Sequence, residues 1–194
     1  MGVQLMVLKL TKVRSTVRCF LLVLCLGVVF SACSTGSEIR SGLLPGSGAP
    51  LSVLVLPFSN LTTTPDAGKA VTTILTSELL RRQDLRVVPA SSMPVPIPEG
   101  VSAINIPASL RDRLKSMGID SLLSGSVMEY AYRSELESEP VVGINWVMTD
   151  LRTGQVLWSV ALSGVGSCFL GCSQTLTSLS GKLIHNEVDR FVAR

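Results

Sequence analysis

Two runs in the second half of the chain alternate between apolar and polar residues, and this pattern restricts the fold more than any other feature. Successive side chains of a strand point to opposite faces of a sheet, so each run places its apolar residues on one face. The runs cover residues 141–150 and 155–163, and the Thr153-Gly154 pair between them is typical of a turn. The apolar positions are Val142, Ile144, Trp146, Met148, Val156, Trp158, Val160 and Leu162. We expect two antiparallel strands with one buried face, and both tryptophans in the core.

The remaining patterns predict further strands and three helices. Residues 51–58 are apolar on both faces, which indicates a buried strand, and residues 85–88 and 121–132 are also strand-like. Helical stripes occupy residues 66–82, with Asp66 as the N-cap, then 107–118, and then 174–192. The order βαβαβββα predicts an α/β (α+β) fold, in which a mixed sheet of about five strands is flanked by three helices.

The N-terminus has the pattern of a bacterial lipoprotein signal. Four basic residues precede an apolar stretch at 19–30, and the run Phe30-Ser31-Ala32-Cys33 follows. Cleavage would remove residues 1–32 and leave Cys33 as a lipidated N-terminus carrying palmitate-type chains. Soluble secretion and an uncleaved membrane anchor are the alternatives. Ser34 favours retention in the outer membrane, at its periplasmic face, because lipoproteins of the inner membrane typically carry Asp at that position.

The signal also changes the charge and the domain boundaries. The whole chain has 17 Lys and Arg against 14 Asp and Glu, and the signal holds four of the basic residues. The mature chain is therefore near neutral, and its charge gives no support to nucleic-acid binding. Residues 33–50 are rich in Ser, Gly and Pro and indicate a flexible tether, followed by one globular domain at 51–194.

Two cysteines close a short loop after the last predicted strand. Cys168 and Cys172 could form a disulfide in an oxidising envelope compartment, and free thiols are the alternative. A metal site is disfavoured, because two thiols and one histidine do not complete a ligand set. We predict no cofactor.

The sequence predicts no catalytic constellation, and we expect the protein not to be an enzyme. His185 is the only histidine and lies on the terminal helix, where a structural role is favoured over a general base. Asp150 precedes the Thr153-Gly154 turn, where a hydrogen-bonding turn residue is favoured over an acid catalyst.

Four segments of the predicted domain are informative together: "VLVLPFSNLT" (53–62), "ILTSELLRR" (74–82), "GIDSLLSGSVMEYAYR" (118–133) and "VMTDLRTGQVLWS" (147–159). Taken together, they resemble the CsgG-like and TolB N-terminal-like domain family. The stretch "EYAYRSELESEPVVGINW" (129–146) is most similar to the PelC-like branch of outer-membrane lipoproteins. This resemblance implies a homo-oligomeric ring at the outer membrane and a partner protein in an exopolysaccharide export apparatus.

Two loops offer candidate contacts under that reading. Glu135, Glu137 and Glu139 alternate in a turn, so they either form a solvated tip or, repeated around a ring, guide a cationic polymer. Phe169 and Leu170 lie between the two cysteines, so they either pack within the domain or contact the membrane or a neighbouring subunit.

Two other functions remain open. An LpoB-like activator of a peptidoglycan synthase has a related fold but needs a long tether, which residues 34–50 do not supply. A CsgG-type secretion channel carries additional membrane-spanning hairpins, and the sequence shows no spare pair of suitable strands.

Overall fold

The computed structural model describes residues 37–39, 50–94, 96–97, 101–102, 105–133, 139–166 and 174–192. Within these residues the chain forms one mixed sheet whose strands follow the order β1-β7-β6-β5-β2-β4, with β3 beside β5. The strands are β1 (Ser37–Ile39), β2 (Leu51–Val55), β3 (Ser59–Asn60), β4 (Leu85–Pro89), β5 (Ser121–Arg133), β6 (Glu139–Asp150) and β7 (Val156–Val165). The helices are α2 (Ala67–Leu80), α3 (Ala108–Ser116), α4 (Leu176–Val192) and the short 3₁₀ turn η1 (Ala90–Ser92). The predicted class and order of the main elements are confirmed.

The sheet combines parallel and antiparallel pairs. Strand β2 pairs in parallel with β4 on one side and with β5 on the other. Strands β5, β6 and β7 form the long antiparallel part that the alternating pattern predicts. A β-bulge shifts the register of β5 between Val127 and Glu129.

Two short strands and one cap differ from the expectation. Strand β1 lies inside the stretch predicted to be a tether and pairs with β7, and β3 lies in the expected loop after β2. Both are held by backbone pairing, which leaves no hydrophobic pattern in the sequence. Asp66 occupies the N-cap position of α2, but it has a left-handed φ of 57° and its side chain makes no capping hydrogen bond. Aspartate tolerates this conformation better than most residues.

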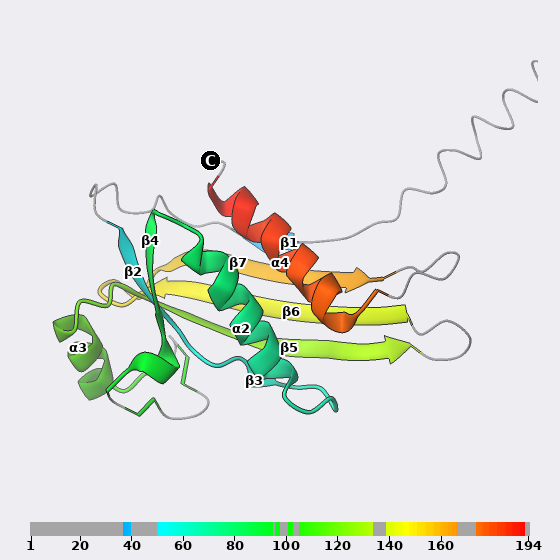
Figure 1. Cartoon of the computed structure of the whole chain (residues 1–194). Coiled ribbons are helices and arrows are strands. Elements are labelled where there is room, and N and C mark those ends of the chain that lie inside the picture. The colour runs from blue at the N-terminus through cyan, green and yellow to red at the C-terminus, as the bar shows by residue number, and fades with distance from the viewer. Residues whose placement is uncertain are drawn as a thin grey trace, which may run out of the picture. The chain divides into compact units, whose positions relative to one another are not determined.

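Helices α2 and α4 cover one face of the sheet (Figure 1). The residues that alternate inward on β5, β6 and β7 pack there against both helices, and Trp146 and Trp158 are fully buried. The two indole rings meet edge to face with centroids 5.3 Å apart, and Trp158 stacks on Phe191 of α4 at 4.2 Å. The main core therefore lies between this face and the helices, and both tryptophans belong to it as predicted.

The opposite face is covered over only part of its width. A second cluster, formed by Leu54, Leu56, Leu114, Leu122 and Leu151 with two isoleucines, packs beneath α3. This cluster lies over β2 and the beginning of β5. Among the described residues, no helix packs on the rest of this face, where β5, β6 and β7 continue. None of the described helices combines the length and the apolar character needed to cross a membrane.

Candidate functional site

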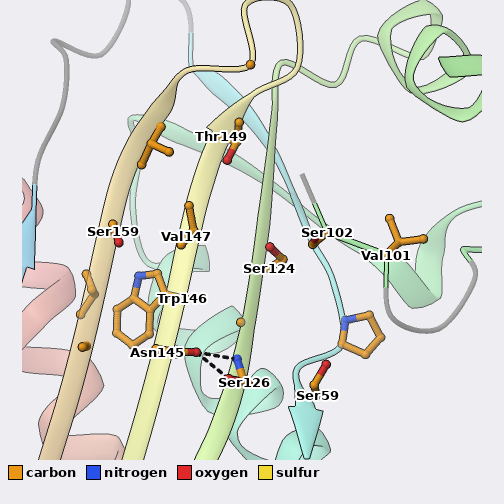
Figure 2. A pocket seen from close by; sticks show the side chains of 16 residues that line it. Ser59, Val101, Ser102, Ser124, Ser126, Asn145, Trp146, Val147, Thr149 and Ser159 are labelled. Atoms are coloured by element: carbon orange, nitrogen blue, oxygen red, sulfur yellow. Dashed lines mark hydrogen bonds between the residues drawn. The ribbon is translucent and has the colours of Figure 1, made fainter. Parts of the chain in front are cut away.

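A trough of about 600 Å³ lies on the uncovered face of β5, β6 and β7 (Figure 2). Its floor consists mostly of small or polar side chains that alternate with the core residues, and its wall comes from two distant pairs of residues, Pro57 with Ser59 and Val101 with Ser102. The floor residues are Ser124, Ser126, Asn145, Val147, Ser159 and Ala161. The sheet thus presents one apolar face to α2 and α4 and a second, hydroxyl-rich face to this trough.

The trough offers hydrogen-bonding groups but no charge. The described residues that line it include no acidic or basic side chain. Asn145 spans two strands, because its Oδ1 accepts hydrogen bonds from the backbone N–H of Ser126 at 3.1 Å and from the Ser126 hydroxyl at 2.7 Å. Trp146 borders the trough, but its side chain belongs to the core on the helix-covered face and is fully buried. This lining suits contact with a neutral surface.

Both predicted contact loops leave from one end of the sheet, which we call the loop end. Arg133 of β5 lies opposite Glu139 of β6, and Val141 of β6 lies opposite Val165 of β7, so residues 134–138 and 167–173 connect there. Glu139, which was predicted to lie in the turn, is instead the first residue of β6, where it pairs with Arg133 and is half-buried. The other predicted site residues, Glu135, Glu137, Cys168, Phe169, Leu170 and Cys172, lie outside the described residues.

Two exposed apolar side chains and one ion pair lie near the loop end. Val165 is 50 % exposed and Tyr132 is 47 % exposed. The Tyr132 hydroxyl accepts a hydrogen bond from the backbone N–H of Leu176 at the start of α4, at 3.3 Å. Glu129 and Arg133 form an ion pair at 3.7 Å. Sequence reasoning missed this grouping, because it depends on the register of three strands.

The direction of β1 relates the predicted lipidation site to the same end. Ser37 lies opposite Ala161 and Ile39 opposite Ser159, so the chain enters β1 from the loop end. Cys33 precedes Ser37 by four residues and lies outside the described residues. Four residues span at most about 14 Å, which limits how far Cys33 can lie from the edge of β7.

His185 takes part in a polar contact between α2 and α4. Its Nδ1 lies 3.0 Å from Oε2 of Glu78, and its Nε2 lies 3.4 Å from Oδ2 of Asp189. Arg81 shares Oε2 of Glu78 at 2.9 Å. The contact joins two helices, in line with the structural role predicted for His185. Within the described part of the chain, no three His, Cys, Asp or Glu residues are grouped as metal ligands would be.

Asp150 organises the turn between β6 and β7. Its Oδ1 accepts hydrogen bonds from the backbone N–H groups of Arg152 and Thr153, both at 2.7 Å. Partial burial by itself raises the pKa of Asp150, but the hydrogen bonds from Thr153 and Arg152 outweigh it and hold the pKa below its usual value. The predicted role as a hydrogen-bonding turn residue is confirmed.

Comparison with known proteins identifies similar solved structures. No family model and no curated protein matches the sequence. The chain is similar to the PelC dodecamer from Paraburkholderia phytofirmans, with 26 % identity and a TM-score of 0.61 over 84 % of this chain and 99 % of that one. A second PelC dodecamer from the same organism gives the same identity and TM-score. The lipoprotein GNA1162 from Neisseria meningitidis shares the fold, with 22 % identity and a TM-score of 0.51 over 75 % of this chain and all of that one. The described domain therefore has a PelC-like fold.

Proposed function

We propose that this chain is a lipid-anchored, non-enzymatic subunit of a homo-oligomeric ring at the periplasmic face of the outer membrane. The ring would belong to an assembly that exports an exopolysaccharide. The observation that carries this proposal is the likeness to PelC dodecamers, which extends over 84 % of the chain. The structural engagement of Asp150 in a turn and of His185 between two helices agrees with a role that requires no catalysis.

The anchor and the loop end support an orientation within that ring. The four residues from Cys33 to Ser37 can span at most about 14 Å, and the chain enters β1 from the loop end. A lipid on Cys33 would hold the loop end towards the membrane. Phe169 and Leu170 belong to a loop that leaves from this end, so they would supply a second contact with lipid or with a neighbouring subunit.

The acidic turn would act through repetition around the ring. Glu135, Glu137 and Glu139 from every subunit would form a negative collar that attracts a cationic or partly deacetylated polymer. Replacing all three by glutamine is expected to lower export while folding is retained. Unchanged export would show that the turn is only a solvated tip.

The central experiment replaces the lipidated residue and compares it with another cysteine of the signal. Cys33→Ser is expected to lose metabolic incorporation of palmitate, to leave the membrane fraction and to abolish polymer export, although the domain is still secreted. Cys25→Ser is the matched control, because it lies in the same segment but precedes the cleavage site, and it should retain all three properties.

Two outcomes would redirect the proposal. Full export by the soluble Cys33→Ser protein would show that the anchor is not needed for function. If cells that carry Cys33→Ser export the polymer normally but have a defect in cell-wall synthesis, the LpoB-like activator is favoured instead.

A further inference from the structure

The uncovered face of β5, β6 and β7 raises the question of what covers it. Six residues of its floor, contributed by all three strands, are uncharged, and four of them are serine or alanine. The exposed face of an antiparallel sheet in water normally carries polar and charged side chains in alternation with the core residues. Depletion of charge is instead a property of the centre of protein interfaces.

We propose that this trough is the surface through which one copy of the chain binds the next copy in the ring. The inference rests on the proposed ring and assigns the contact to particular residues. A second copy is the occupant that the comparisons favour, because the PelC structures that share the fold are dodecamers. Small side chains such as Ser159 and Ala161 allow the backbone of a neighbour to approach the strands closely.

The position of the trough also fits the geometry of a ring. A ring needs two different contacting faces on each subunit. In a ring of twelve, neighbouring subunits are related by a rotation of only about 30°, so the two contacting faces of one subunit lie on nearly opposite sides. The trough lies on one face of the sheet, and α2 and α4 cover the other (Figure 1). The trough of one copy would therefore face the helix layer of its neighbour.

An exported polysaccharide fits the trough less well. A cationic or partly deacetylated polymer is recognised through aromatic faces or opposite charges. Among the described residues that line the trough, Trp146 is the only aromatic one and is fully buried, and none is acidic. Two described acidic residues, Glu129 of β5 and Glu139 of β6, lie instead beyond the trough, towards the loop end.

The test introduces a charge into the floor of the trough in the full lipoprotein, purified in detergent. Ser159→Arg places an unpaired charge in the proposed contact, and we expect the concentration needed for assembly to rise by at least about tenfold. Ser159→Ala should assemble like the wild type. Ser116→Arg is the matched control, because it makes the same change at an exposed serine of α3 outside the trough. Mass photometry over a concentration series measures assembly, and thermal melting verifies folding.

The possible results distinguish failure of the proposed ring from failure of the trough as its interface. A wild-type protein that remains monomeric at high concentration overturns both. A wild-type ring with unaltered assembly of folded Ser159→Arg leaves the ring in place and overturns the trough as its interface.

A second measurement covers the case in which Ser159→Arg fails to fold. A photo-crosslinking amino acid at Val147, in the middle of the floor, is expected to give a covalent dimer of the chain. Capture of polysaccharide, or the absence of a dimer in a preparation that does form rings, overturns the inference.

Discussion

The two faces of strands β5, β6 and β7 are built from alternating residues of the same segments, yet they differ in nearly every physical respect. Trp146 and Trp158 point to the helix-covered face and are fully buried, whereas their neighbours Asn145 and Ser159 point to the trough and are only half-buried. Apolar burial is the dominant favourable term in folding. The helix-covered face therefore supplies most of the stability of the fold, and the residues of the trough face contribute less to it.

The largest effect is expected on the helix-covered face, from Trp158→Ala. The substitution removes a fully buried ring that stacks on Phe191 at 4.2 Å and meets Trp146 at 5.3 Å. We expect a loss of about 3–5 kcal/mol in the free energy of unfolding, measured by denaturant titration.

Trp158→Phe is the matched control for this substitution. The indole Nε1 of Trp158 is buried and has no hydrogen-bond partner. Phenylalanine keeps a ring and removes that unsatisfied donor, so it should cost much less than alanine. Equal losses for the two variants would show that ring packing is not the source of the stability.

The two faces also differ in how far the sequence predicts them. The alternation in residues 141–163 identifies the core positions, because burial on one face imposes a period of two. The trough carries no such signal. Its wall comes from Pro57, Ser59, Val101 and Ser102, which are brought to the sheet by tertiary packing alone. Strand β1 was missed for a related reason, since three residues paired through the backbone leave no side-chain pattern.

An intermediate effect on the free energy of unfolding is expected at the turn between β6 and β7, which belongs to neither face. Asp150→Ala removes an acceptor that binds two backbone N–H groups at 2.7 Å, and we expect a loss of about 1 kcal/mol in the free energy of unfolding. Asp150→Asn keeps an acceptor oxygen but loses its charge, so it should cost less.

The contribution of the Asp150 carboxylate to the free energy of unfolding depends on pH. The pKa of Asp150 is lower in the folded protein than its usual value, so the charged form is stabilised by folding. Its contribution is fully present above the unfolded pKa of about 3.9 and is lost as the pH falls through the lower, folded pKa. Denaturant titrations should show a constant difference between wild type and Asp150→Asn near neutral pH and a shrinking difference below about pH 4. A difference that grows in acid would contradict this assignment.

The smallest effect is expected from Ser124→Ala on the trough face, and its neighbour in the sequence supplies the contrast. Leu123 points to the helix-covered face and is fully buried, so Leu123→Ala should cost about 2–5 kcal/mol. Ser124 lines the trough on the other face, so Ser124→Ala should change the free energy of unfolding by less than about 0.5 kcal/mol.

Both titrations should be made at a concentration at which the protein is monomeric, because assembly would add its own stabilisation. A cost above about 1 kcal/mol for Ser124→Ala would mean that the trough face stabilises the single subunit. The proposed contrast between a stabilising face and a partner-binding face would then be wrong, because a surface that serves only to bind a partner stabilises the protein only when that partner is bound.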